Sequence, residues 1–456
     1  MKYFLFNRGL RIKDNTSLIK LAQCDDNPVI CIFVFTPEQI DEEENSYFSH
    51  NAVGFMCETL SELNDELKEH HSQLYCFKGD LIKVLKKIHK IEPITVLGFN
   101  HDYTPYAIKR EKELHDFCKE INATIIAEED YLLYPIIGGG TLKADGSPYR
   151  IFTPYRNSVM KKPVPKVDGF KKFDFAKNSK LKEISLGNLS GFYADNPTRL
   201  VKGGRTEALK KLNNLKNFDD YNKTRDILHI RTTLLSAFIS FGVLSIREVY
   251  WKIVDLHGKN HGLITELIWR DFYTMILYFF PYVIKGNFKQ NFDKMEWENS
   301  KKWLKLWEEG QTGFPLVDAG MRQLVKEGFM ANRNRMVVSS FLIKQMLINW
   351  KYGEKFFAKH LTDIYLPSNN GGWQWAFGGV DPNYWRVFNP LTQGQKFDKD
   401  CEYIKFYIPE LKDVPPEHIH QWDKYHTEYK DIDYPSPCLD LKGRRLHFLK
   451  VVKKIK

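Results

Sequence analysis

Four side chains between residues 266 and 273 combine a carboxylate, an indole, a guanidinium and a phenol at helical spacing. Glu266, Trp269, Arg270 and Tyr273 are three or four residues apart and would share one helical face. A carboxylate and a guanidinium on an otherwise apolar stripe are costly to bury without partners. The stripe therefore indicates either a ligand-binding face or a Glu–Arg pair on an exposed helix surface.

Two other stretches could bind phosphate. Thr232-Thr-Leu-Leu-Ser236 places hydroxyl groups just ahead of a predicted helix, where hydroxyl and free N–H groups bind phosphate, although ordinary N-capping would use the same residues. Asn332-Arg-Asn-Arg335 opens another predicted helix with two guanidiniums and two amides. That turn suits either a phosphate or ligand or an exposed basic surface.

The segment 363–377 has an unusual composition, with two asparagines and two glycines ahead of Trp373-Gln-Trp375. Glycine permits close backbone approach and amides both donate and accept, so we expect a loop rather than a packed helix. Such a loop could hold a planar aromatic ligand or form a rigid turn over a tryptophan-rich core. Tryptophans recur at 297, 303, 307, 350 and 385. Rings of this kind usually pack in a core, although a chain of indoles can also pass an electron.

The first part of the chain alternates short apolar runs with amphipathic helices. The predicted strands are 3–7, 29–35, 73–78, 94–99 and 123–127, and helices are predicted at 52–69, 81–91 and 107–121. Apolar strands that alternate with helices predict a parallel, Rossmann-like α/β sheet with helices on both faces. No G-x-G-x-x-G opens the first helix, so the dinucleotide fingerprint is absent.

Helical periodicity dominates from residue 203 onward and predicts an all-α second domain. The predicted helices are 206–215, 233–241, 245–257, 263–280, 301–308, 317–327, 335–349 and 354–361. Between the two parts, a Gly-, Pro- and Lys-rich segment reads as a long ordered connection, whose dense stretch 149–157 could dock on either domain. The predicted domains are therefore 1–130 and 203–456, joined by the connection 131–202.

Composition restricts the setting in which the protein works. The chain has 456 residues and a formal charge of +10, which favours a polyanionic partner, although a solvated lysine surface would also account for it. Its seven scattered cysteines never form C-x-x-C, so we expect reduced intracellular thiols and neither disulfides nor a metal site. No stretch suits a signal peptide or a membrane span, so we expect a soluble, intracellular, non-secreted monomer with no obligate protein partner.

The order and spacing of these motifs resemble the photolyase/cryptochrome family across nearly the whole chain, and specifically class I-type cyclobutane pyrimidine dimer photolyases. The blocks that carry the resemblance are Arg11-Ile-Lys-Asp-Asn15, Ile151-Phe-Thr-Pro-Tyr155, Thr232 to Ser236, Glu266-Leu-Ile-Trp-Arg270, 313–322, Asn332 to Met336 and Asn369-Asn-Gly-Gly-Trp-Gln-Trp375. The resemblance implies an α/β domain followed by a helical domain that holds a U-shaped FAD.

The resemblance also implies which residues line the FAD site. They are Tyr221, Thr232, Thr233, Leu234, Leu235, Ser236, Glu266, Arg270, Asn332, Arg335, Asp363, Ile364, Tyr365 and Asn369. In that pattern Arg335 pairs with Asp363, and Asn369 faces flavin N5. An amide there can accept from a protonated N5, whereas a carboxylate would disfavour the anionic reduced form, FADH⁻.

The implied activity is light-driven repair of pyrimidine dimers in DNA by electron transfer from FADH⁻ to a flipped-out dimer. The resemblance makes Trp269 and Trp375 an aromatic wedge, and Glu266 and Asn332 hydrogen-bonding partners of the bases, with Asn369 completing the catalytic set. The expected DNA-binding residues also include Arg225, Arg333 and Met336. The expected electron-transfer chain to oxidised FAD is Trp373, Trp350 and Trp297, with Trp373 nearest the flavin.

Several residues depart from the family pattern and leave alternatives open. Tyr365 stands where relatives usually carry a second aspartate, Leu234 replaces a polar residue, and Phe329 replaces a tryptophan. Tyr106-Ala107 lacks the Asn-Glu pair of folate-binding relatives, so a second chromophore could be a deazaflavin, a folate or none. The other readings are a cryptochrome-like photoreceptor, a six-four photoproduct photolyase and a basic DNA-binding protein with a vestigial flavin pocket. The asparagine at 369 and the Ala331-Asn332 pair argue against the first two.

Overall fold

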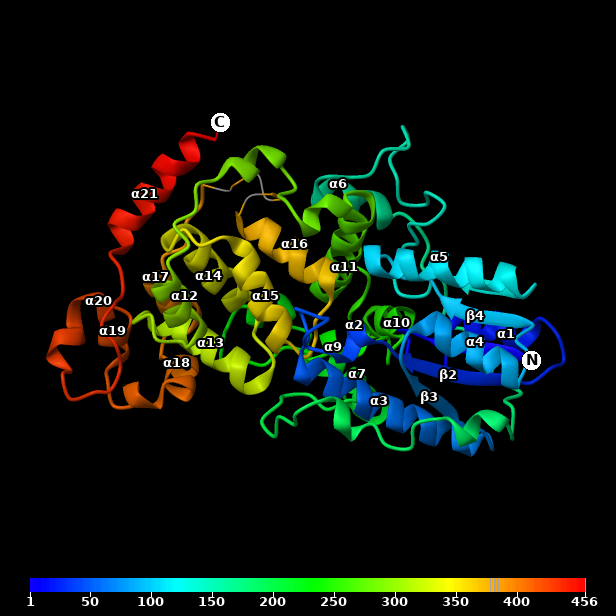
Figure 1. The fold of residues 1–456 in the computed structure, drawn as a ribbon. Coiled ribbons are helices and arrows are strands. Elements are labelled where there is room, and N and C mark those ends of the chain that lie inside the picture. The colour runs from blue at the N-terminus through cyan, green and yellow to red at the C-terminus, as the bar shows by residue number, and fades with distance from the viewer. Residues whose placement is uncertain (378, 381–382, 384, 456) are drawn as a thin grey trace.

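The N-terminal part contains a five-stranded parallel sheet. The structure is a computed structural model that describes residues 1–377, 379–380, 383 and 385–455. The strands are β1 (Lys2–Phe6), β2 (Val29–Phe35), β3 (Leu74–Lys78), β4 (Val96–Asn100) and β5 (Thr124–Glu128), in the order β3-β2-β1-β4-β5. Every neighbouring pair is parallel (Figure 1). The predicted α/β fold is therefore confirmed.

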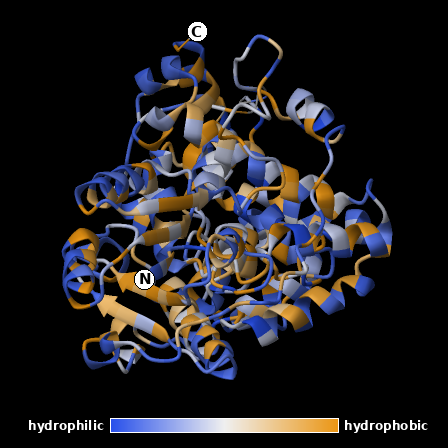
Figure 2. Ribbon diagram, turned by 90° about the vertical axis from the view of Figure 1, so that its right-hand side faces the viewer, coloured by the Kyte–Doolittle hydropathy of each residue, from blue (hydrophilic) through white to orange (hydrophobic). Residues whose placement is uncertain are grey.

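Helices cover both faces of this sheet because alternate strand residues point to opposite sides. Phe4 and Phe33 pack with α1 (Thr16–Gln23) and α3 (His50–Glu69), whereas Tyr3 and Ile32 pack with α4 (Leu81–Ile91) and α5 (Pro105–Glu120). The strands stand out as apolar in Figure 2. Each of the four helices begins at a residue whose side chain accepts a backbone N–H, namely Asn15, Ser49, Asp80 and Thr104.

The connection between the two parts is ordered by contacts with both. Helix α6 (Phe152–Val159) packs on α11 (Gly262–Phe279), so the dense stretch 149–157 docks on the helical part. Further along, Phe175 bridges to Val29, and the Leu186 N–H donates to the Cys76 carbonyl at 2.7 Å, which returns the chain to the sheet. The predicted domain boundaries at 130 and 202 stay predictions.

The remaining chain is helical, as predicted. Its longer helices are α7 (Arg205–Asn213), α10 (Ile246–His257), α11, α12 (Lys301–Glu308), α13 (Pro315–Glu327), α14 (Asn332–Ser340), α15 (Trp350–His360), α16 (Leu366–Phe377), α17 (Pro390–Phe397) and α21 (Leu441–Lys453). Shorter ones near the site are α8 (Tyr221–Thr224) and α9 (Ser236–Ser240). In the described part of the chain, no helix is both long and apolar enough to cross a membrane.

Three local predictions were wrong. The segment predicted as a loop, 363–377, is helical from Leu366 onward. The helix predicted at 233–241 starts only at Ser236, because Leu234 has a left-handed backbone with φ of +54°. The helix predicted at 335–349 begins at Asn332 and ends at Ser340, where a π-helical turn (Phe341–Gln345) follows.

A buried network of charges joins the two parts. Asp130 pairs with Arg11 at 2.6 Å and with Arg247 at 2.8 Å, and Arg247 also pairs with Asp14 at 2.9 Å. These four side chains are at most 10% exposed. Beside them, two consecutive N–H groups, those of residues 9 and 10, donate to the Phe241 carbonyl just after α9, each at 3.1 Å. The network therefore holds the N-terminal segment against one wall of the site described next.

Candidate active site

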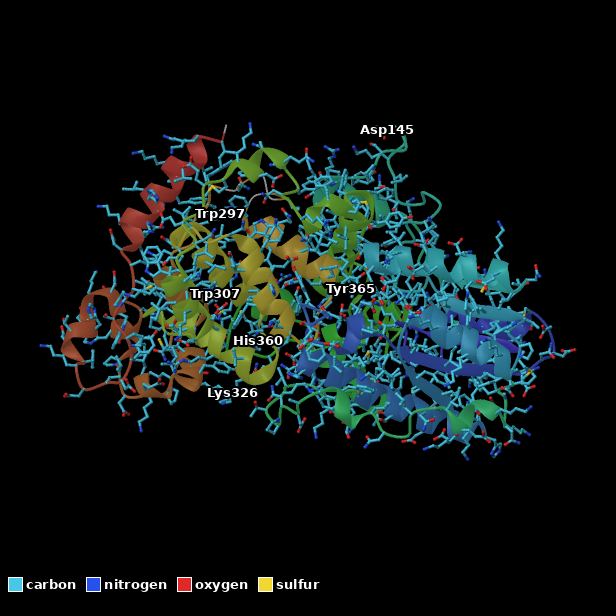
Figure 3. The ribbon with its side chains drawn as sticks, viewed as in Figure 1. Asp145, Trp297, Trp307, Lys326, His360 and Tyr365 are labelled. Atoms are coloured by element: carbon cyan, nitrogen blue, oxygen red, sulfur yellow. The ribbon has the colours of Figure 1, made fainter. Side chains whose placement is uncertain are left out.

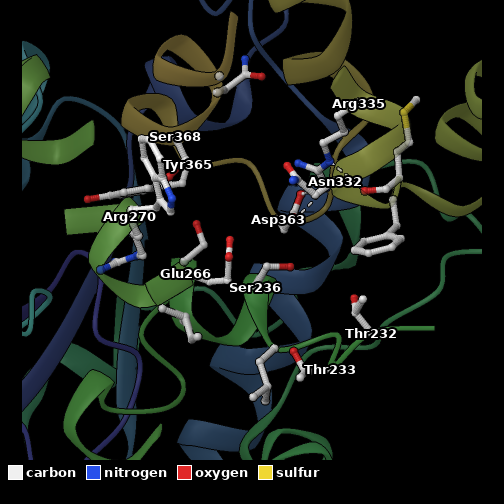
Figure 4. Close-up of a pocket in the computed structure, with 18 of the residues that line it drawn as sticks. Thr232, Thr233, Ser236, Glu266, Arg270, Asn332, Arg335, Asp363, Tyr365 and Ser368 are labelled. Carbon is white, nitrogen blue, oxygen red and sulfur yellow. Dashed lines mark hydrogen bonds and ion pairs between the residues drawn. The ribbon is translucent and has the colours of Figure 1, made fainter. Parts of the chain in front are cut away.

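A cavity of about 550 Å³ opens in the helical part, close to its junction with the α/β part (Figure 4). It is lined by the loop 232–235 with α9, by α11, by the start of α14, by residues 361–365 and by α16. All fourteen residues predicted for the cofactor line it. So do the six predicted for DNA, which are Asn332, already counted for the cofactor, and Arg225, Trp269, Arg333, Met336 and Trp375.

The helical stripe on α11 faces this cavity. Glu266, Trp269, Arg270 and Tyr273 all contribute to its wall. Glu266 pairs with Arg225 of the neighbouring segment and not with Arg270, so the alternative of a surface Glu–Arg helix pair is wrong. Burial raises the pKa of the Glu266 carboxyl, although the Arg225 guanidinium opposes that rise. The carboxyl is thus an ion-pair partner of Arg225 and a hydrogen-bond acceptor in the cavity wall.

The first turn of α14 supplies polar groups to the opposite wall. Arg335 Nη2 donates to both carboxylate oxygens of Asp363, at 3.2 and 3.0 Å, which confirms the predicted pair. Arg333 donates through Nη2 to Asp226 at 2.6 Å. Asn332 Nδ2 lies 3.8 Å from the sulfur of Met336.

Helix α16 orients Asn369 toward the cavity. Asn369 Nδ2 donates to the backbone carbonyl of Glu354 at 3.0 Å, which leaves Oδ1 as the group available to a ligand. The next residue, Asn370, donates through Nδ2 to the Glu354 carboxylate at 3.0 Å and to the Val283 carbonyl at 3.1 Å. Burial raises the pKa of Glu354 to about 7. The helix is packed because Gly371 lets the ring of Tyr273 approach: an added Cβ would lie 2.1 Å from that ring.

Tyr365 forms a bridge between the cavity wall and the α/β part (Figure 3). Its ring lies between two guanidiniums, 5.0 Å from Arg8 and 4.5 Å from Arg270. Its hydroxyl is 2.8 Å from the Thr274 hydroxyl, and burial raises its pKa. Position 365, which departs from the family pattern, therefore contributes a phenol and not a carboxylate to the cavity wall.

Family models and relatives agree over almost the whole chain. Residues 3–169 match the model of DNA photolyase, and residues 263–454 match the model of the FAD binding domain of DNA photolyase. A deoxyribodipyrimidine photo-lyase of Halobacterium salinarum is 31% identical, with 98% of this chain and 97% of that protein covered. One of Escherichia coli is 30% identical, with 97% and 96% covered. This chain belongs to the photolyase/cryptochrome family.

The solved structures that this chain resembles come from more than one class of the family. An archaeal photolyase from Sulfolobus tokodaii with two FAD molecules has a TM-score of 0.88 at 34% identity, with 99% of each chain covered. A class III photolyase from Agrobacterium tumefaciens has a TM-score of 0.85 at 28% identity, covering 100% of this chain and 97% of that one. A Synechocystis cryptochrome reaches 0.90 at 25% identity, with 98% of each covered. The class I assignment stays a prediction.

The side chains that line the cavity suit the binding of FAD, in agreement with the match to the FAD binding domain. The hydroxyls of Thr232, Thr233 and Ser236 gather in one region of the wall, and the Arg335–Asp363 pair with the free Asn369 oxygen supplies donors and acceptors elsewhere. Hydroxyls suit phosphate, and the pair with the amide suits a hydrogen-bonding ring system. In the described part of the chain, no group of His, Cys, Asp or Glu is arranged to hold a metal ion.

The tryptophans of this photolyase-family chain divide into two groups. Trp269 and Trp375 line the cavity, and Phe152 of α6 stacks on Trp269 with ring centroids 3.4 Å apart. Trp373 also lines it but is only 2% exposed. Trp350 and Trp297 lie outside the lining, the first buried and the second 4.9 Å from the ring of Phe377.

Sequence reasoning missed three residues that act on the site through contacts. Phe152 supports Trp269, Glu354 orients Asn369, and Trp307 approaches Trp373 with centroids 6.3 Å apart. Phe152 lies in the block 151–155, but nothing in that block indicates that its ring stacks on Trp269. The other two have no signal in the sequence beyond their residue type, because their partners lie 15 and 66 positions away.

Proposed function

We propose that this protein repairs cyclobutane pyrimidine dimers in DNA in a light-dependent reaction that uses reduced FAD. The observation that supports it most directly is that one cavity is lined both by the residues expected to hold FAD and by those expected to hold a flipped dimer. Relatives from Halobacterium and Escherichia that carry the name deoxyribodipyrimidine photo-lyase agree with this activity.

Reduced FAD, when bound, would supply the light-excited electron that splits the dimer. The residues we assign to it are Tyr221, Thr232, Thr233, Leu234, Leu235, Ser236, Glu266, Arg270, Asn332, Arg335, Asp363, Ile364, Tyr365 and Asn369. Among them, Asn369 offers Oδ1 to a protonated ring nitrogen because its Nδ2 is already donated to Glu354. A neutral acceptor there favours an anionic reduced cofactor, whereas a carboxylate would repel it.

The same wall would receive the lesion. The rings of Trp269 and Trp375 offer aromatic faces that replace the stacking that the two bases of the dimer lose when they leave the DNA helix. Glu266 and Asn332 would hydrogen-bond the edges of the dimer and stabilise negative charge as it arrives. Met336 fills space beside them. We assign Arg225 and Arg333 to the flanking phosphates, in agreement with the formal charge of +10.

Trp373 is the residue best placed to donate an electron to oxidised FAD, because it lines the cavity and is almost fully buried. We propose that Trp350 and Trp297 continue the path toward the surface. A second chromophore, deazaflavin or folate, also stays a proposal, and the Sulfolobus structure with two FAD molecules adds FAD to the candidates. We further propose that the protein acts on DNA as an intracellular monomer.

A cryptochrome-like photoreceptor is the second candidate, favoured by the TM-score of 0.90 with the Synechocystis cryptochrome. The deciding experiment is incubation of the reduced, FAD-loaded protein with ultraviolet-damaged oligothymidine, in blue light and in the dark. We expect dimers to disappear only in the light, measured by recovery of thymine absorbance. Dimers that survive illumination would contradict repair and leave the photoreceptor; a parallel arm with a six-four photoproduct tests the third reading.

A further inference from the structure

Two consecutive residues just after α8 form ion pairs with two helices that line the cavity. Arg225 pairs with Glu266 on α11, and Asp226 Oδ2 accepts from Arg333 Nη2 on α14 at 2.6 Å. Arg225, Glu266 and Arg333 line the cavity, whereas Asp226 lies outside its lining. The segment 225–226 therefore joins the two helices from which a base and a phosphate would be bound.

These ion pairs lie at partly exposed positions. The side chains of Arg225 and Glu266 are 26% and 31% exposed, and those of Arg333 and Asp226 are 19% and 30% exposed. Pairs at such positions change an equilibrium by about 1.5- to 5-fold. The Arg333 guanidinium also lies over the Phe397 ring at 4.4 Å, and its Nε is buried with no partner among the described atoms. A phosphate, which binds a guanidinium by two parallel hydrogen bonds, can compete with Asp226 for it.

The pairs change what an undamaged duplex meets at the mouth. Although the whole chain carries a formal charge of +10, the mouth arginines are each neutralised by a carboxylate, as Arg335 is by Asp363. An undamaged backbone offers phosphates but no base that enters the cavity and engages Glu266. A flipped dimer brings both a base that enters the cavity and phosphates beside it. It can therefore separate Glu266 from Arg225 while its own phosphates lie close by. Residues 225 and 226 are consecutive, so a shift of Arg225 toward phosphate also changes the separation of Asp226 from Arg333.

We propose that Asp226 is a specificity-determining residue that withholds Arg333 from the DNA backbone until a lesion occupies the cavity. The inference rests on the proposed function, because only a lesion-binding cavity supplies the event that releases the pair. In this role Asp226 contacts neither FAD nor the dimer. In the undamaged complex Arg333 stays with Asp226; in the lesion complex it contacts phosphate.

The test is the salt dependence of DNA binding by Asp226→Asn, with FAD-loaded protein in the dark. Two duplexes of one sequence are used, one of them with a single thymine dimer. With the undamaged duplex, the slope of log K against log salt should steepen by about 0.9, the value for one added phosphate contact. With the dimer duplex the slope should match that of the unaltered protein, while affinity rises up to about 5-fold because no ion pair has to open.

A matched control is Asp220→Asn, which removes the same charge just before α8. Asp220 pairs with Lys223 at 2.6 Å, but both side chains are exposed, at 63% and 80%. Its slopes should equal those of the unaltered protein with both duplexes. In Asp226→Asn/Arg333→Gln the steepening should vanish, since Arg333 is the cation released. Retained FAD absorbance and circular dichroism establish that each variant is folded.

Three results would overturn the role of Asp226. One is an unchanged slope of Asp226→Asn with undamaged DNA; another is equal steepening with both duplexes; the third is steepening that survives loss of Arg333. The proposed function fails in a different way, if the unaltered protein binds both duplexes equally and leaves dimers intact in light. If the unaltered protein prefers the dimer duplex but Asp226→Asn leaves the slope with undamaged DNA unchanged, only the inference about Asp226 is contradicted.

Discussion

Replacing Asp130 with asparagine should loosen the junction that supports the cavity. Asp130 is fully buried and accepts from Arg11 Nη2 at 2.6 Å, from Arg247 Nη2 at 2.8 Å and from the Thr16 hydroxyl at 2.8 Å. Asparagine keeps the volume, but it removes the negative charge and turns one acceptor into a donor that faces a guanidinium. The substitution thus removes the carboxylate that Arg11 and Arg247 share, and Arg247 keeps only its pair with Asp14.

Two separate arguments set the size of the effect. Removing one partner of a buried ion pair typically costs about 3–5 kcal/mol. Independently, burial would raise the pKa of Asp130, but Arg11 and Arg247 outweigh burial and lower the pKa from 3.8 to about 2. That difference corresponds to about 2 kcal/mol of stability, present above pH 4 and lost as the pH falls through 2. We therefore expect Asp130→Asn to lower the free energy of unfolding by about 3 kcal/mol at pH 7.

Urea unfolding of the flavin-free protein at pH 7 measures the first quantity, and unfolding at pH 3 measures the part of the second that is lost by that pH, about 1 kcal/mol. The variant should also lose less stability than the unaltered protein between these two pH values. Glu128→Gln is the matched control, because Glu128 pairs with Lys20 while 36% exposed, and it should change stability by less than about 0.5 kcal/mol. If Asp130→Asn behaves like this control, or keeps the full acid sensitivity, the buried network does not hold the two parts together as argued.

Two further substitutions probe the site directly. Trp373→Phe should abolish light-driven reduction of oxidised FAD, followed by absorbance, while repair by chemically reduced enzyme persists; loss of both would remove the separation of roles proposed for this ring. Gly353→Ala places a Cβ 2.1 Å from the buried indole of Trp373, so flavin-free protein should lose about 1–3 kcal/mol in urea unfolding. Its control, Gly372→Ala, meets nothing within 4 Å and should gain about 0.5–1 kcal/mol, and equal effects in the two variants would contradict the packing argument.

Local patterns in the sequence were enough to find the five strands and many of the helices. The five strands and the parallel sheet follow from short apolar runs that alternate with amphipathic helices, and the α11 stripe from Glu266 to Tyr273 follows from spacing of three and four residues. The family motifs added the Arg335–Asp363 pair, which the structure confirms. The strands and the stripe depend on residues that are close in sequence, whereas Arg335 and Asp363 are 28 residues apart and were paired through the family pattern.

Tertiary structure alone decided which polar groups meet. Residues 366–377 pack as a helix in which Gly371 contacts Tyr273, about a hundred positions earlier, and Asn370 reaches the Val283 carbonyl. Likewise, nothing in the spacing of Asp226 and Arg333, 107 residues apart, indicates that they form an ion pair. Side-chain periodicity tells which face is buried, but the partner on that face depends on how distant elements pack, and that packing is decided by the whole core.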